Sequence, residues 1–389
     1  MNILHISPYF PDIDENHAGG VCMGKEIDTL KKWNRVFVLT FIASKFDHDI
    51  AAKYKNDYFY KTVYINKWTK FIHVLFFPLL PNFFAARSSL RFAFHIISII
   101  KKNNIEAVHA EYSSMGQYFN LIRWLFPSIR INLVEHDVTI QSYERIMDRT
   151  TGIIRCYYKW QCKLIKRAEA SYCRKADTVI AFNEKDKELI QKYYKIEDVR
   201  VINPYYGLDE GIEFESDKTQ KGKNICFLGQ MGRKENYEAA YRLIQISKVI
   251  KKNIPDLQVY IVGNNPPQYL KSEENEYIHV TGYVEEVDSY ILKCQLAVFP
   301  LFLGAGIKLK VLRSLALGVP VITGKVGAEG IDEEGKIIIL AESNDEYQLA
   351  VEDLLNDDKK RQALSEKSKI YAVNNFGWKK SIETLRSLY

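Results

Sequence analysis

The sequence predicts an α/β protein built from two doubly wound parallel-sheet domains. First, 389 residues with 47% hydrophobic and 26% charged side chains suit a folded chain of two or three ordinary domains. Second, short apolar runs recur between longer amphipathic stretches, as expected for parallel strands joined by crossover helices. Third, this rhythm is interrupted by the polar stretch 213–223 and restarts at Asn224.

The apolar runs define the expected strands in chain order. In the first half they are 2–8, 35–43, 106–110, 131–135 and 178–182, and in the second 223–229, 257–263, 277–281, 295–301, 319–323 and 336–340. We therefore expect an N-terminal Rossmann-like domain at 1–205, a linker at 206–222 and a second Rossmann-like domain at 223–370. Residues 371–389 are expected to form a helix that crosses back to the first domain. Ligands of such folds bind at the carboxyl ends of the strands.

The cysteines and the first residues indicate a cytoplasmic protein. Six cysteines occur without a C-x-x-C pair, which argues against a zinc ribbon, an iron-sulfur site or a disulfide scaffold. Met1 leads directly into the apolar run at 3–6 with no basic flank, so we expect a core strand there and no signal peptide.

Positive charge gathers in residues 51–130, which hold 11 basic and 3 acidic side chains, a net charge of +8. The same window contains many large aromatic residues, among them Trp68, Phe71, Phe76, Phe77, Phe83, Phe84, Trp124 and Phe126. Its longest apolar run, 71–86, is too short and interrupted to span a bilayer. Peripheral contact with anionic lipid is one interpretation, and a domain core with a solvated basic face is the other. Nucleic-acid binding is weaker, because no recognised module accompanies the charge.

The segment 300–322 carries the strongest chemical signal. It has the pattern of a strand, a loop with Gly304 and Gly306, a helix closed by Gly318, and a strand opened by Pro320. Glycines let backbone amides approach an anion, and Lys308 and Lys310 add positive charge at the helix start. The pattern predicts a phosphate or diphosphate site, although an ordinary turn with solvated lysines fits the spacing too.

Extended to residue 331, this segment resembles the donor-binding signature of the group 1 (family 4-like) glycosyltransferases of GT-B fold, G-x-G-x-(Arg/Lys)-x-K-x-x-E-A-x-A-x-G-x-P-V. Further segments are similar to that family in the same order along the chain: 18–20, 135–138, 176–186, 227–236, 259–264 and 280–284.

The resemblance implies a hexosyltransferase of polysaccharide or glycoconjugate biosynthesis, retaining and independent of metal or other cofactors. A nucleotide-sugar donor, UDP-sugar first, would lie in the C-terminal domain. A glycan or lipid-linked acceptor would be held mainly by the N-terminal domain, at the inner face of the plasma membrane. Nucleic acid is not an expected partner.

The same resemblance assigns site residues. Departure of a nucleoside diphosphate needs fixed positive charge, so Lys308 and Lys310 are the catalytic candidates on the donor side. His136 is the candidate on the acceptor side, where it would orient sugar hydroxyls or the acceptor. The donor would contact Gly229, Arg233, Asn264, Tyr283, Val284, Gly304, Ala305, Gly306, Ile307, Lys308, Lys310 and Arg313. The acceptor-side cleft would contain Gly19, Gly20, Glu111 and Asp137.

One position departs from the family pattern. Arg313 stands where a glutamate usually binds the nucleotide ribose, and Ala305 stands at the earlier glutamate of the E-x7-E version. An arginine cannot accept hydrogen bonds from ribose hydroxyls, but it can bind a phosphate or an acidic group. A non-catalytic glycosyltransferase-like subunit therefore stays open as an alternative, as does a nucleotide-sugar epimerase of similar fold.

Two Asp-x-Asp pairs, at 12–14 and 47–49, could suggest a metal site. Neither follows an expected strand, so we interpret both as solvated loops and predict no metal.

Overall fold

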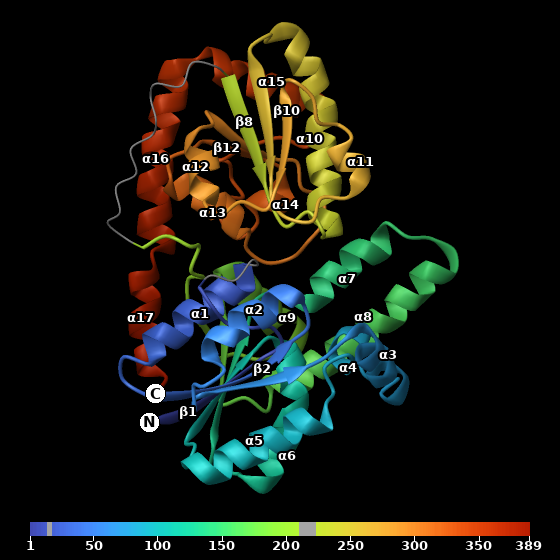
Figure 1. Cartoon of the computed structure of the whole chain (residues 1–389), viewed down its shortest axis with the longest axis vertical. Coiled ribbons are helices and arrows are strands. Elements are labelled where there is room, and N and C mark those ends of the chain that lie inside the picture. The colour runs from blue at the N-terminus through green and yellow to red at the C-terminus, as the bar shows by residue number, and fades with distance from the viewer. Residues whose placement is uncertain (14–17, 210–222) are drawn as a thin grey trace. The chain divides into compact units, whose positions relative to one another are not determined.

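The chain folds into two compact units in the computed structural model, which describes residues 1–13, 18–209 and 223–389 (Figure 1). Unit 1 comprises Met1–Tyr205 together with Lys379–Tyr389, and unit 2 comprises Tyr206–Trp378. Most of the expected linker, residues 210–222, lies outside the described residues.

Unit 1 contains a seven-stranded parallel sheet in the order β3-β2-β1-β4-β5-β6-β7. Its strands are β1 (Asn2–Ser7), β2 (Arg35–Ile42), β3 (Tyr60–Tyr64), β4 (Ala107–Glu111), β5 (Arg130–Glu135), β6 (Thr178–Ala181) and β7 (Val199–Val201). The central strands are almost wholly buried, as their continuous apolar runs require. The edge strands β3 and β7 were not expected, because each is short and partly exposed.

The helices of unit 1 are α1 (Ala18–Leu30), α2 (Lys45–Ala51), α3 (Lys67–Phe76), α4 (Asn82–Ala85), α5 (Leu90–Asn103), α6 (Phe119–Leu125), α7 (Thr139–Asp148), α8 (Gly152–Cys173) and α9 (Glu184–Tyr194), with 3-10 turns η1 (Ala52–Tyr54) and η2 (Ser113–Tyr118). Helix α17 (Trp378–Ser387) ends the chain and packs against unit 1. Ser381 in α17 hydrogen-bonds the backbone of Asn203, and Arg130 Nη1 donates to Leu388 O at 2.8 Å.

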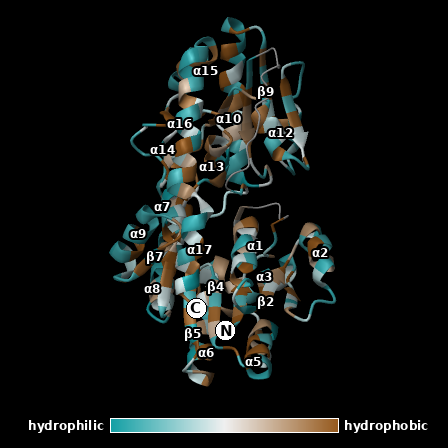
Figure 2. Cartoon of the chain, turned by 90° about the vertical axis from the view of Figure 1, so that its left-hand side faces the viewer, coloured by the Kyte–Doolittle hydropathy of each residue, from teal (hydrophilic) through white to brown (hydrophobic). Residues whose placement is uncertain are grey.

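Unit 2 contains a six-stranded parallel sheet in the order β10-β9-β8-β11-β12-β13. Its strands are β8 (Lys223–Leu228), β9 (Leu257–Val262), β10 (Ile278–Gly282), β11 (Leu296–Phe299), β12 (Val321–Thr323) and β13 (Ile339–Leu340). Its helices are α10 (Lys234–Asn253), α11 (Gln268–Lys271), α12 (Val287–Leu292), α13 (Leu309–Ala316), α14 (Lys325–Ala328), α15 (Asn344–Asn356) and α16 (Asp358–Phe376). In Figure 2 strand β9 is coloured largely as hydrophobic residues, whereas many residues of α16 are hydrophilic.

The two sheets confirm the predicted architecture of doubly wound parallel-sheet domains. The strand order reverses at β1/β4 in unit 1 and at β8/β11 in unit 2, and such switch points are where open α/β sheets bind ligands. Within the described ranges, no helix combines the length and apolarity needed to cross a bilayer.

Two expectations about loops are wrong. Asp47 and Asp49 lie in α2, where Asp47 closes a capping box with Ser44. Asp12 is buried and accepts a hydrogen bond from Tyr54 Oη at 2.6 Å, whereas Asp14 lies outside the described residues. Asp47 and Asp49 are therefore in a helix rather than a loop, and Asp12 is not solvated.

Candidate functional site

In unit 2, the loops that follow β8 and β9 approach each other closely at Gly229 and Gly263. A Cβ added at Gly263 would lie 1.7 Å from Gly229 O, and its φ is 147°. Only glycine fits such a position. The loops are tied by backbone bonds from Gly229 N to Val262 O (3.0 Å) and from Met231 N to Asn264 O (2.9 Å).

Lys310, in the first turn of α13, reaches this place. Its Nζ donates to Asn236 Oδ1 at 2.6 Å and lies 4.7 Å from the centre of the Phe227 ring. A Cβ added at Gly229 would come within 3.1 Å of the same nitrogen. Burial, together with the nearby charges of Lys308 and Arg233, lowers the pKa of Lys310 to about 7. The hydrogen-bond partner is a neutral amide, so an anionic ligand here would gain a full opposite charge.

The loop before α13 also presents positive charge. Gly304 and Gly306 have φ values of 111° and 66°, which glycine adopts without strain. Lys308 Nζ folds back onto its own loop and donates to Ala305 O (3.0 Å) and Gly306 O (2.5 Å). Ile307, in the same loop, is partly buried and packs against the core of unit 2.

The other predicted donor residues are less tightly gathered. Arg233 is mainly exposed and pairs with Glu235 at 2.6 Å, yet it is near enough to depress the pKa of Lys310. Tyr283, after β10, is 61% exposed, whereas Val284 packs on the core. Asn264 Oδ1 is a buried acceptor that no described residue hydrogen-bonds.

Arg313 is engaged elsewhere. Its Nε donates to Asp288 Oδ1 of α12 at 2.5 Å, and the two side chains are 30% and 21% exposed. Gly207, with φ at 91°, lies so close that an added Cβ would be 2.6 Å from Arg313 Nη1. The arginine at the expected ribose position is thus part of an ion pair.

In unit 1, His136 follows β5 and is hydrogen-bonded to Glu111 at the end of β4. The His136 Nε2–Glu111 Oε2 distance is 2.7 Å. The imidazole stacks on Tyr112 with ring centres 3.8 Å apart and meets the edge of Phe182 at 4.6 Å. Tyr112 has a φ of 65°, a strained conformation for a bulky residue that is frequent at functional sites.

Beneath His136, Glu111 is the centre of a buried polar network. Its Oε1 lies 3.0 Å from His5 Nε2 and 3.1 Å from His109 Nε2. His109 Nε2 also lies 3.2 Å from Glu26 Oε2, and its Nδ1 is bonded to the hydroxyl of Tyr389. His5, Glu26, His109 and Glu111 are all fully buried.

The pKa shifts in this network show which of its residues carry charge. Burial would raise the pKa of Glu111, but hydrogen bonds from His109, His136 and His5 outweigh burial and hold it well below the usual range. Burial opposes the charging of His109, but Tyr389, Glu111 and Glu26 raise its pKa well above normal. Burial and the charge of Glu111 raise the pKa of Glu26. Glu111 is therefore the anion, and its acceptor-only carboxylate requires the proton of His136 on Nε2.

The atoms His5 Nε2, His109 Nε2 and Glu111 Oε1 lie within 4.8 Å of one another, and such a set could hold a metal ion. They already satisfy one another by hydrogen bonds, which accounts for the arrangement without an ion.

The remaining acceptor-side residues are Gly19, Gly20 and Asp137. Gly19 and Gly20 form the first turn of α1 rather than a loop, and Gly20 O accepts a bond from Asp12 N at 3.2 Å. Asp137 is half-buried next to His136.

The sequence did not single out Asn236, Tyr112, His5, His109, Glu26 or Tyr389. The available signal was a histidine in each of two otherwise apolar strands, and the register pairs His5 directly with His109.

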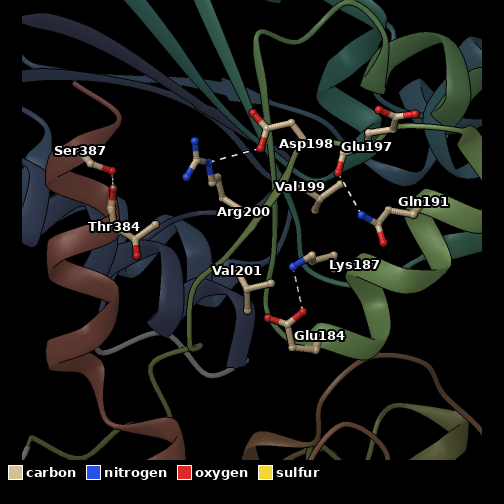
Figure 3. Close-up of a pocket in the computed structure, with 10 residues that line it drawn as sticks. All are labelled: Glu184, Lys187, Gln191, Glu197, Asp198, Val199, Arg200, Val201, Thr384 and Ser387. Carbon is tan, nitrogen blue, oxygen red and sulfur yellow. Dashed lines mark hydrogen bonds and ion pairs between the residues drawn. The ribbon is translucent and has the colours of Figure 1, made fainter.

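A groove of about 570 Å³ also lies in unit 1, beside α9, β7 and α17 (Figure 3). Its polar side chains largely pair among themselves, as in the Lys187–Glu184 and Arg200–Asp198 contacts. It contains no residue that the sequence marked as functional.

Comparison with known proteins accounts for both units. Residues 36–209 match the model of Glycosyltransferase Family 4, and residues 222–357 match that of Glycosyl transferases group 1. The chain belongs to the group 1, family 4-like glycosyltransferases.

An uncharacterized glycosyltransferase of Methanocaldococcus jannaschii is 24% identical over 236 residues, which cover 56% of this chain and 59% of that protein. Spore coat protein SA of Bacillus subtilis is 38% identical over 80 residues, covering 20% of this chain and 21% of that one. The chain thus matches less than two thirds of the length of either curated relative.

Solved structures of similar fold include glycosyltransferases. A sucrose-phosphate synthase of Thermosynechococcus elongatus superposes with a TM-score of 0.73 at 15% identity, covering 100% of this chain and 98% of that one. HepE of Anabaena in complex with UDP gives 0.69 at 13% identity, with 100% of both chains covered. These likenesses confirm the GT-B fold of the chain.

Proposed function

We propose that this glycosyltransferase transfers a hexose from a nucleoside-diphosphate sugar to a glycan or lipid-linked acceptor, with retention and without metal, in the assembly of a cell-surface polysaccharide or glycoconjugate. The observation that carries the proposal is the position of Lys310, whose ammonium lies against Gly229 and, among the described residues, has a neutral amide as its hydrogen-bond partner.

The donor side would stabilise the departing diphosphate. Negative charge grows on the leaving group, and oriented amides and fixed cations lower the energy of that charge. Lys310, Lys308 and the glycine-rich loop at the start of α13 offer such groups. HepE has been solved with UDP and with UDP-glucose, which makes UDP the first nucleotide to test.

The acceptor side would use His136. Its Nε2 is occupied by Glu111, so a substrate hydroxyl can be met only by Nδ1. In the neutral imidazole this nitrogen accepts a hydrogen bond, which suits the orientation of an acceptor hydroxyl.

A thermal-shift screen with UDP, GDP, CDP, dTDP and ADP tests the donor site. One nucleotide should stabilise the fold selectively, by about 2.7 kcal/mol at a hundred times its dissociation constant. Lys310→Met should abolish the shift, whereas Lys360→Met, at an exposed ion pair of α16, should preserve it. If one nucleotide binds, transfer to acceptors would be assayed with the sugars of that nucleotide. No shift with any nucleotide would contradict the proposal.

The Arg313–Asp288 pair favours a second candidate, a non-catalytic partner subunit. Arg313 itself has no hydrogen-bond acceptor to take the place of the usual glutamate. If the native protein is inert and Arg313→Glu combined with Asp288→Asn gains nucleotide affinity, the non-catalytic function is favoured. Measurable transfer by the native protein would refute it.

We further propose that unit 1 contacts the inner face of the plasma membrane through a surface built on α3. This helix buries no residue, and Trp68, Phe71 and Phe76 are 75%, 56% and 77% exposed. Helix α8 extends the surface with Ile153 and Trp160, outside the window 51–130, and α4 joins the two helices through the bond from Asn82 Nδ2 to Tyr157 Oη. Figure 1 shows α3, α4 and α8 side by side. By contrast, Phe84 from the same window is buried in the core.

Charge on the same helices suits anionic lipid. Helix α8 has five basic residues and one acidic residue, and α3 has two lysines and no acidic residue. Apolar side chains flanked by basic ones are the usual means by which a helix binds a negative bilayer surface.

Flotation with phosphatidylglycerol and phosphatidylcholine vesicles tests the surface. Binding should require the anionic lipid and weaken at raised salt, and Trp68→Glu with Phe71→Glu should remove it. Leu349→Glu is the matched control, because Leu349 is 65% exposed in unit 2. Absence of binding to either vesicle would overturn this part of the proposal.

A further inference from the structure

Arg87, after α4 in unit 1, is a buried cation without an acidic partner among the described residues. Only 5% of the residue is exposed. Its Nη1 donates to Phe83 O at 3.2 Å, and its Nε lies 3.5 Å from Pro8 O. The guanidinium also lies over the rings of Tyr9 and Phe83, at 4.7 and 4.5 Å from their centres. These carbonyl and ring contacts from the described part of the chain do not neutralise its positive charge.

The fold holds Arg87 firmly in this place. Its carbonyl accepts a hydrogen bond from Tyr118 Oη at 2.6 Å, and its amide donates to Phe84 O at 2.9 Å. Tyr118 in turn stacks on Phe92 in the core, with ring centres 5.0 Å apart. The guanidinium is therefore fixed before any ligand arrives, which reduces the entropic cost of binding.

Helix α3 also carries a cation near Arg87. Lys70 is partly buried, and burial together with the charge of Arg87 lowers its pKa, whereas Asp47 acts in the opposite direction. A buried guanidinium without a carboxylate beside it is costly unless an anion joins it. A guanidinium also matches the oxygens of a phosphate in two parallel hydrogen bonds.

The surroundings indicate which anion. The Tyr9 ring that lies under Arg87 also contacts Tyr112, with centres 5.6 Å apart, and Tyr112 stacks on His136. On its other side, Arg87 neighbours α3, the helix with the exposed apolar face, whose His73 contacts Ala86 O. We propose that Arg87 and Lys70 bind a phosphate or diphosphate group of the acceptor. This inference rests on the proposed transferase function and specifies the class of acceptor.

Binding of inorganic pyrophosphate, measured by calorimetry on the full chain, tests the site. The Lys310→Met variant serves as background, because the donor site in unit 2 would bind the same anion. Pyrophosphate should still bind this background. Added Arg87→Lys should weaken binding at least tenfold, and added Lys70→Met at least fivefold, whereas Arg91→Lys on the exposed surface of α5 should leave it unchanged.

Farnesyl diphosphate distinguishes a lipid-linked source from a free one. Affinity at least tenfold above that of pyrophosphate indicates a lipid-linked diphosphate, and equal affinity indicates recognition of the phosphate group alone. Loss of pyrophosphate binding in the Lys310→Met background, or unchanged binding after both Arg87→Lys and Lys70→Met, would overturn the proposal.

UDP affinity, measured in chains that keep Lys310, separates this inference from the proposed function. It should be the same with and without the Arg87 and Lys70 substitutions if these variants fold. Because Lys70 lies on a helix that buries no side chain, Lys70→Met keeps the test informative even if Arg87→Lys is unstable.

Discussion

Nucleotide affinity should fall steeply above neutral pH because Lys310 titrates near pH 7. Burial and the neighbouring cations Lys308 and Arg233 lower its pKa to about 7. About half of the Lys310 side chains are then protonated at pH 7 and about 1% at pH 9. If only the ammonium form binds the diphosphate well, UDP affinity decreases up to about 50-fold over this interval. Binding at pH 7 should also take up about half a proton, since a bound diphosphate favours the charged lysine.

Calorimetry of UDP binding at pH 7, 8 and 9 measures this decrease, and buffers of different ionisation enthalpy reveal the proton uptake. The interval lies above the second phosphate pKa of about 6, so the ligand's own titration contributes little. Lys310→Arg keeps its charge over the whole range and should give a nearly flat profile. Unchanged wild-type affinity between pH 7 and 9 would refute the reasoning, as would the same decrease in Lys310→Arg.

Three further results are expected. Glu111→Gln should lower kcat at least tenfold and alter its pH profile, because His136 loses the anion that fixes its tautomer, and UDP affinity should stay unchanged. The control is Asp177→Asn, before β6 at the opposite edge of the sheet, which should leave the pH profile of kcat unchanged. Arg313→Ala should destabilise the fold by about 1 kcal/mol by leaving half-buried Asp288 unpaired, and the thermal midpoint should recover when Asp288→Asn is added. Burial raises the pKa of Glu169 to about 7, so the folded chain holds a proton that the unfolded chain releases near pH 4.5. The free energy of unfolding should therefore fall by up to about 3 kcal/mol as pH rises from 4.5 through 7. Urea unfolding of Glu169→Gln should show no such fall.

The sequence was sufficient for the central strands because each is buried on both faces and appears as a continuous apolar run. Edge strands β3 and β7 lack that signal, since one face is exposed and β7 has three residues. The glycine-rich loop before α13 was predictable for a local reason: Gly304, Gly306 and both lysines are close in the chain, and the helix start fixes their surroundings.

Long-range partners could not be predicted in the same way. Asn236 holds Lys310 from 74 positions away, and Tyr389 meets His109 across 280 positions. Such contacts depend on strand register and on the path of α17, which local patterns do not specify. The ion pair of Arg313 could not be predicted either, because its partner Asp288 lies on a helix whose position depends on tertiary packing.

Lys310 and Arg87 are each oriented by a hydrogen bond to a neutral acceptor. Lys310 in unit 2 is bonded to an amide, and Arg87 in unit 1 is bonded to a backbone carbonyl, so neither charge is cancelled by the hydrogen bond that orients it. A carboxylate partner would orient each cation equally well, but an incoming phosphate would then have to compete with it. Neutral partners leave the attraction for the ligand, at the expense of folding stability. This reasoning predicts that Arg87→Met and Lys310→Met each lose anion binding while the thermal midpoint of the ligand-free chain falls less than a lost ion pair would require. A large fall in that midpoint for both variants would mean that the cations are structural.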